Sequence, residues 1–323
     1  MKKLISVIIA ITMITCLFAG CGTSANDGVY KIAIVQQLDH SSLNEIRAAI
    51  ESELDAIAAE QGITIEYKDF NGQNDSTVLN QIGAQVVSDD YDAIIPIATL
   101  AAQCMVTAAE GYDIPIIYAA CSDPANAGLT DLANVTGTSD ALNTAFILDM
   151  MRTVNPDVRT VGLLYSNSEP NSETPIAEAK AYLDEMGIAY LEKTGNTADE
   201  VISAANALVG RCDAVFTPTD NVVMNVAGAV AEVLNAAGIP HYTGADSFVA
   251  QGAFATCGVN YTELGTYTAR MAMDVLLTGE VPAFHLMDGG IITVNTETAA
   301  ALNLDYSGFA SMANTVQEVP AGQ

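Results

Sequence analysis

Short apolar runs rich in valine and isoleucine alternate with longer amphipathic stretches along most of the chain. The run IAIV inside KIAIVQ at 31–36 is of the first kind, and YTELGTYTARMAMDVLLTG at 261–279 is of the second. Apolar runs of this length predict buried strands, whereas amphipathic stretches predict helices. Strands that alternate regularly with helices are typical of βαβ units around a parallel sheet, so the sequence predicts an α/β fold.

The alternation occurs twice with related content, because three strand-and-loop segments of the first half recur in the same order in the second half. We therefore expect two similar doubly wound parallel-sheet lobes. The pairs are 31–46 with 159–176, 91–99 with 212–220, and 112–124 with 236–247.

Small polar residues near 134–140 and 257–260 mark two crossings between the lobes, and a third crossing would complete a three-strand hinge. The helix at 261–279 would return to lobe one, and a strand at 290–294 would rejoin lobe two. Residues 308–323 lack a periodic pattern and predict a flexible tail. The expected boundaries are 30–138 plus 259–280 for lobe one and 139–258 plus 281–307 for lobe two.

The N-terminus has the features of an export signal. Lys2 and Lys3 precede an apolar stretch from Leu4 to Ala19, and the small residues Ala19 and Gly20 stand before Cys21. We expect residues 1–20 to be a lipoprotein signal peptide, Cys21 to carry the lipid, and residues 21–29 to be a flexible tether. A plain signal peptide or a membrane-spanning anchor is the alternative, which the shortness of the apolar run disfavours.

The net charge of −28 at pH 7 argues against nucleic acid as a partner and against broad attraction to anionic lipid. No cofactor is expected. Four cysteines beyond Cys21 match no zinc spacing and lie in or beside apolar runs, so small buried core residues are favoured over disulfides. They are Cys104, Cys121, Cys212 and Cys257.

The candidate site follows from topology. Ligands bind outside the carboxyl ends of parallel strands, so the strand-end loops of two facing lobes should converge on one cleft. A buried ligand charge needs a partner of opposite sign or hydrogen bonds. For a ligand ammonium we favour Asp220 and Asp246, with Asp140 and Asp123 behind them, although each aspartate could instead cap a helix or hold a turn.

A ligand carboxylate would bind where helices begin, at free backbone N–H groups and nearby hydroxyls, and plain helix capping is again the alternative. The candidates there are Ser41, Ser42, Thr99, Asn171 and Ser172, and Asn221 beside Asp220 is a further one. Shape selection would fall to Phe70, Asn71 and Tyr118, unless these simply belong to the core. His40 in the first cleft loop could also hydrogen-bond a ligand.

Catalytic signatures are missing from the sequence. It contains no G-x-S-x-G, no H-E-x-x-H and no G-x-x-x-x-G-K-[ST], and its three histidines are too dispersed for a metal site. A binding protein is therefore expected rather than an enzyme.

Seven strings in register resemble the ABC-transporter substrate-binding lipoproteins whose members include tryptophan- and tyrosine-binding ones. They are KIAIVQ, FNGQND, IATLAAQ, CSDPANAGL, NVTGTSD, PTDN and YTELGTYTARMA. The chain departs from the family's pattern at Leu100, where proline is common, and at Gly244–Ser247.

The resemblance implies a type I periplasmic-binding fold, a small ligand enclosed by hinge closure, and delivery to an ABC permease with its ATPase. The ligand would be an amino acid, possibly aromatic. The protein would act as a monomer at the outer face of the cell membrane, held there by lipidated Cys21. The alternative is a receptor domain of the same fold that reports its ligand to a membrane signalling protein.

Overall fold

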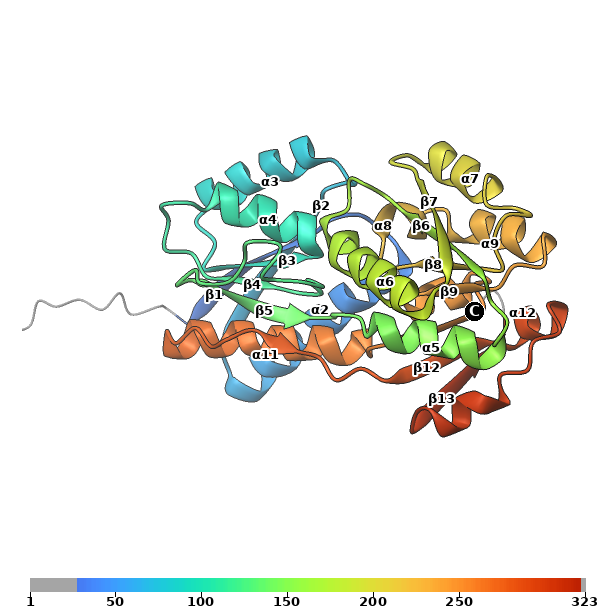
Figure 1. Ribbon diagram of the computed structural model, residues 1–323. Coiled ribbons are helices and arrows are strands. Elements are labelled where there is room, and N and C mark those ends of the chain that lie inside the picture. Colours follow the sequence, from blue (N-terminus) through green and yellow to red (C-terminus); the bar gives the residue numbers. More distant parts are fainter. Residues whose placement is uncertain (1–27, 321–323) are drawn as a thin grey trace, which may run out of the picture.

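The computed structural model describes residues 28–320, which form two α/β lobes side by side (Figure 1). The expected signal peptide at 1–20, the lipid attachment at Cys21 and nearly all of the expected tether lie outside the described residues. The first strand begins at Val29, the last residue that had been assigned to the tether.

Lobe one is built on a six-stranded parallel sheet in the order β11-β5-β4-β3-β1-β2. Helices α2 and α11 pack together on one face of this sheet, and α3 and α4 pack on the other. The strands are β1 (Val29–Gln36), β2 (Thr64–Asn71), β3 (Ala93–Ile97), β4 (Ile116–Tyr118), β5 (Val135–Ser139) and β11 (His285–Leu286). The helices are α2 (Ser41–Gln61), α3 (Ser76–Ser88), α4 (Thr99–Ala108) and α11 (Tyr261–Thr278).

Lobe two has a seven-stranded sheet in the order β13-β12-β10-β9-β8-β6-β7. All neighbouring strands are parallel except the pair β10 and β12, which is antiparallel. Helices α5 and α6 cover one face, and α7 and α9 cover the other. The strands are β6 (Thr160–Tyr165), β7 (Ala189–Thr194), β8 (Ala214–Thr217), β9 (His241–Thr243), β10 (Ala255–Gly258), β12 (Ile291–Asn295) and β13 (Thr315–Val319). The helical segments are α5 (Thr144–Val154), η1 (Pro170–Ser172), α6 (Glu173–Met186), α7 (Ala198–Asn206), α8 (Asn221–Met224), α9 (Ala227–Ala236), α10 (Asp246–Ala250), α12 (Thr296–Ala301) and η2 (Ser307–Ser311).

The two sheets share one strand order, which is the structural counterpart of the sequence repeat. Across the sheets, the order β2-β1-β3-β4-β5 of lobe one matches β7-β6-β8-β9-β10 of lobe two. The central strands β3 and β8 are buried along their whole length because helices cover both faces. The predicted class, two doubly wound parallel-sheet lobes, is therefore confirmed.

Two segments differ from the expected boundaries. Strand β11, which had been assigned to lobe two, pairs with β5 and extends the sheet of lobe one. The expected flexible tail instead forms η2 and strand β13, which pairs in parallel with β12 over five residues. Phe309 of η2 is fully buried against Phe254, so the apolar packing of one aromatic ring holds this segment to the lobe.

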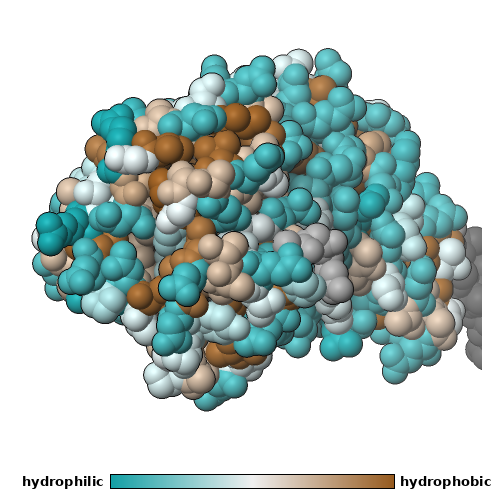
Figure 2. All heavy atoms as spheres, turned by 90° about the vertical axis from the view of Figure 1, so that its right-hand side faces the viewer, coloured by the Kyte–Doolittle hydropathy of each residue, from teal (hydrophilic) through white to brown (hydrophobic). Residues whose placement is uncertain are grey.

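The end of the molecule formed by lobe two is covered mainly by hydrophilic residues, broken by smaller hydrophobic areas (Figure 2). Within residues 28–320, no helix is both long enough and apolar enough to span a bilayer. The four cysteines of this part of the chain are free thiols, and three of them are buried, in agreement with the expectation of core residues.

Candidate ligand-binding site

A narrow cavity lies between the lobes, where strands of both sheets end. Loops after β1, β3, β4 and β5 of lobe one and after β6, β8 and β9 of lobe two supply its wall. This is the convergence that the topology predicts. The wall consists of His40, Ser42, Leu43, Ala98, Thr99, Ala120, Ser122, Asp140, Asn171, Thr219, Asp220, Asn221, Met224, Ala245, Ser247, Phe248 and Tyr261.

Three helices begin at this wall without a side-chain cap. The residues before α2, α4 and α10 are His40, Ala98 and Ala245, and none of them accepts a hydrogen bond from the first turn of its helix. Two other helices that begin at this wall do have a side-chain cap, α8 from Asp220 and α11 from Asn260. The first turns of α2 and α4 therefore keep backbone N–H donors and a partial positive charge for an anionic group.

The backbone at the ends of β3 and β4 is strained. Ala98 and Ala120, which both line the cavity, have φ angles of 79° and 55°. Positive φ is costly for a residue that carries a Cβ, and such residues persist where the surrounding structure fixes them. Here the turn at Ala98 aims the start of α4 at the cavity.

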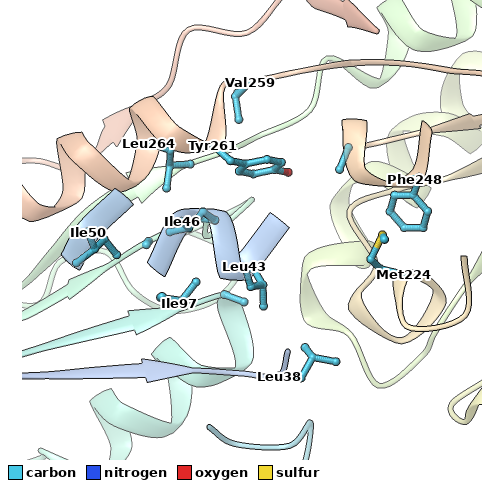
Figure 3. Close-up of a cluster of buried hydrophobic side chains, with 14 of the residues drawn as sticks. Leu38, Leu43, Ile46, Ile50, Ile97, Met224, Phe248, Val259, Tyr261 and Leu264 are labelled. Carbon is cyan, nitrogen blue, oxygen red and sulfur yellow. The ribbon is translucent and has the colours of Figure 1, made fainter. Parts of the chain in front are cut away.

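One side of the cavity is apolar. Leu43 of lobe one faces Met224 and Phe248 of lobe two across the gap between the lobes (Figure 3). Phe248 is 2% exposed, so its ring is anchored in the lobe and little of its surface borders the cavity. This side can accommodate a hydrophobic group, and the thioether of Met224 can adapt to an aromatic ring.

Asp140 is the acidic group of the opposite side, at the point where the chain leaves β5 and crosses to lobe two. Its Oδ1 accepts a hydrogen bond from Ser122 Oγ at 2.9 Å, and its Oδ2 accepts only a long one, 3.4 Å, from Tyr261 Oη. Burial raises the pKa of Asp140, and the hydrogen bonds from Ser122, from the backbone of Asp140 itself and from Tyr261 oppose this shift only in part. The carboxylate thus has acceptor capacity to spare.

Asp220 has a different environment although it lines the same cavity. Its Oδ2 accepts hydrogen bonds from Ser166 N and Ser172 Oγ, both at 2.7 Å, and its Oδ1 accepts one from Val223 N at 2.9 Å. Burial raises its pKa, and these bonds lower it. Asp220 therefore caps α8 and ties it to the loop after β6.

The buried side-chain atoms of the wall that lack a partner are acceptors. Asn171 Oδ1 is buried without a partner, while its Nδ2 donates to the Thr219 carbonyl. His40 Nε2 lies 2.9 Å from Asn221 Oδ1, so Nε2 carries the proton and the unpaired Nδ1 is an acceptor. Burial lowers the pKa of His40, which favours this neutral form. No lysine or arginine of the described chain is part of the wall. The cavity therefore calls for a guest that brings N–H donors and positive charge.

Direct hydrogen bonds join the lobes around the cavity. Ser42 Oγ donates to Ser247 Oγ at 2.5 Å. Because Ser122 donates its proton to Asp140, the 3.1 Å contact between Ser122 and Thr219 is a bond donated by Thr219. Thr174 Oγ1 also donates to Asp123 Oδ2 at 2.7 Å at the rim. The cavity is thus bounded by contacts between lobes as well as within them.

The structure brings six of the predicted site residues together in the wall: Ser42, Thr99, Asp140, Asn171, Asp220 and Asn221. Seven others lie outside the wall. Ser41 is exposed, Phe70 and Tyr118 pack in the core of lobe one, and Asn71 caps a turn of its own loop at Gln73 N. Asp123 bonds across the rim, Ser172 stands behind Asp220, and Asp246 faces Glu45 beyond Tyr261.

Sequence reasoning missed several wall residues. Ser122 and Thr219 each directly precede an aspartate that was chosen, so the repeat itself could have pointed to them. Met224, Phe248 and Tyr261 stand one helical turn or less inside α8, α10 and α11, where apolar residues look like core. Glu169, which is buried beside the wall residue Asn221, belongs to no sequence pattern that could have singled it out.

Comparisons with known proteins agree with this architecture. The chain is 32% identical over 325 residues to the tyrosine-binding protein of Clostridioides difficile, covering 94% of this chain and 93% of that protein. A Streptococcus pneumoniae ABC domain in complex with L-Trp superposes with a TM-score of 0.82 at 28% identity, covering 89% of this chain and 99% of that one. The ligand-free, open structure of a Clostridium difficile substrate-binding protein gives a TM-score of 0.68 at 30% identity, covering 90% and 99%.

The family model for ABC transporter substrate binding proteins matches residues 31–312, which include both sheets up to η2 and every residue of the cavity wall. The chain belongs to the family of ABC transporter substrate-binding proteins.

Proposed function

We propose that this chain captures an α-amino acid, with aromatic side chains preferred, between its two lobes and hands it to an ABC permease and its ATPase. The family's role is substrate binding, not catalysis. Its members work outside the cytoplasm. We propose that residues 1–20 are a signal peptide and that lipid on Cys21 holds the protein at the outer face of the cell membrane.

The observation that carries this proposal is Asp140, a buried carboxylate with a free acceptor in a cavity wall that has no cation. A buried charge without a partner is costly, and a ligand ammonium would neutralise it. Asp140 thus takes the role for which Asp220 and Asp246 were first favoured. Asn171 Oδ1, also unpaired in the wall, is a second acceptor for ammonium protons.

The rest of an amino acid has matching partners. The free backbone N–H groups at the uncapped starts of α2 and α4 would bind the carboxylate. The side chain would lie against Leu43, Met224 and Phe248. Relatives named for tyrosine and bound to tryptophan support an aromatic side chain.

Hinge closure is the proposed mechanism. The TM-score is higher with the L-Trp complex than with the open, ligand-free structure, although sequence identity is similar, and this supports a closed arrangement of the lobes. A ligand that contacts both lobes adds interactions only in the closed form and shifts the population toward it.

A thermal-shift screen of the protein against amino acids, nucleosides and sugars tests the proposal. A ligand that binds only the native state stabilises it, by about 2.7 kcal/mol at a ligand concentration of 100 Kd. The melting temperature rises as a result. We expect the largest shifts with L-tryptophan and L-tyrosine. A shift with sugars or nucleosides and none with amino acids would refute the assignment.

A further inference from the structure

Glu169 is a buried acid that plays no part in ligand binding as proposed above. It is 2% exposed and stands at the start of η1 in lobe two. Its Oε1 accepts a hydrogen bond from Gln37 Nε2 of lobe one at 2.8 Å, and its Oε2 accepts one from Asn221 Nδ2 at 2.7 Å. The carboxyl group therefore links the two lobes directly.

The same group also supports the cavity wall. Asn221 passes the network on to His40 of lobe one, and both of these residues line the cavity. The chain of contacts runs from lobe one to lobe two and back: Gln37, Glu169, Asn221, His40. Separation of the lobes breaks it at both ends and exposes Glu169 to water.

Hydrogen bonds from Gln37 and from the side chain and backbone of Asn221 favour a charged Glu169, but burial and a neighbouring charge outweigh them. The buried carboxyl of Asp220 is its nearest charged neighbour, and burial followed by the charge of Asp220 raises the pKa of Glu169 to about 8. Lys180 and Glu169 line one hollow of lobe two, but Lys180 pairs with Glu192 at 2.5 Å. Titratable groups on the packed elements are Asp39 and His40 before α2, Asp75 before α3, Glu173 and Lys180 on α6, and Asp220 before α8.

A proton on Glu169 also has an acceptor. Gln37 Oε1 is buried without a partner, and turning the Gln37 amide over places this oxygen toward Glu169. Because Gln37 Nε2 also donates to Asn74 Oδ1 at 2.8 Å, the Asn74 amide must turn with it, so that Asn74 Nδ2 then donates to Gln37 Oε1. A protonated Glu169 could then donate to Gln37 while it still accepts from Asn221. In the open form Gln37 is withdrawn and this arrangement is lost.

Building on the proposed function, we infer that Glu169 is a positioning residue that couples lobe closure to the uptake of one proton: it is protonated between Gln37 and Asn221 in the closed form and ionised when the lobes part. Because its proton affinity is higher in the closed form, closure and ligand affinity are favoured at low pH. Affinity falls as the pH rises from the ordinary range of a glutamate toward about 8.

The test is calorimetry of the full chain with L-tryptophan as the probe, in phosphate and in Tris, between pH 5.5 and 8.5. The two buffers differ in ionisation enthalpy, so the comparison counts protons taken up on binding. The dissociation constant of the wild type should increase by up to tenfold per pH unit from pH 6 to 8. Glu169→Gln mimics the protonated acid, so it should bind at pH 8 more tightly than the wild type, and its affinity should not fall as the pH rises from 6 to 8.

Glu173→Gln is the matched control, because Glu173 also bonds across the lobes, to Asn126, but is exposed. It should keep the wild-type profile and proton uptake. Burial lowers the pKa of His40, so His40 would release a proton on closure in both proteins. The difference in proton uptake between the wild type and Glu169→Gln therefore decides the inference. Equal pH profiles and equal proton uptake for these two proteins would overturn the inference and leave the proposed function intact.

Absence of heat with L-tryptophan and L-tyrosine would count against the proposed function instead. Amide exchange of residues 37–43 in the ligand-free chain, corrected for the intrinsic pH dependence of exchange, then decides the inference without a ligand. Stronger protection at pH 5.5 than at pH 8 in the wild type, and not in Glu169→Gln, supports it. Equal protection at both pH values in both proteins contradicts it.

Discussion

Two buried aspartates of the cavity differ in the hydrogen bonds that they already make. Asp220 accepts three bonds of 2.9 Å or shorter from its own lobe, whereas Asp140 has one short bond and one of 3.4 Å. The sequence places both after strands and cannot distinguish them, because the donors to Asp220 come from residues about 50 positions away. Charge recognition is therefore a property of partner geometry, which residue type and position do not encode.

Exchanging each aspartate for asparagine should separate ligand recognition from stability. Asp140→Asn removes the proposed ammonium partner and should weaken binding of L-tryptophan by about 2–5 kcal/mol, at least roughly 30-fold. Asp220→Asn replaces an acceptor of two backbone N–H bonds by a group that is half donor and should lower the free energy of unfolding by about 1–3 kcal/mol. Calorimetry and denaturant unfolding measure the two effects. Strong loss of affinity in Asp220→Asn with none in Asp140→Asn would reverse the assignment.

At the scale of elements, regular hydrophobic patterns predicted strands and helices, whereas stretches without such a pattern predicted none. The apolar runs at 31–36 and 91–99 became β1 and β3, and the amphipathic stretch at 261–279 became α11. Strand β13 was missed because TVQEV is short and mostly exposed, and it forms only through pairing with β12. Such an edge strand depends on tertiary context more than on its own residues.

Removing the chain after Ala313 tests the role of β13. Without β13, the outer edge of β12 and its backbone groups from Ile291 to Asn295 lose their parallel partner. We expect a loss of roughly 1–2 kcal/mol, seen as a fall of a few degrees in melting temperature. Affinity for L-tryptophan should stay unchanged because none of the removed residues lines the cavity. An unchanged melting temperature would mean that the tail contributes nothing to lobe two.

At the scale of the whole molecule, the duplication was visible in the sequence because each half repeats the same strand, loop and helix strings. The convergence of the loops followed from this topology alone, and six predicted residues do meet in one wall. The contacts that hold the lobes together could not be predicted from the sequence in the same way. It depends on pairs such as Ser42 with Ser247 and Gln37 with Glu169, which join residues more than 130 positions apart.

The central claim is that the cavity recognises the charged amino group of an amino acid enclosed by both lobes. Calorimetric titration with L-tryptophan and with indole-3-propionate, which lacks only the amine, tests it most directly. We predict binding of L-tryptophan and a loss of at least about 30-fold in affinity for the desamino compound, since Asp140 would then stay buried and unpaired. Equal affinity for the two compounds would contradict the account.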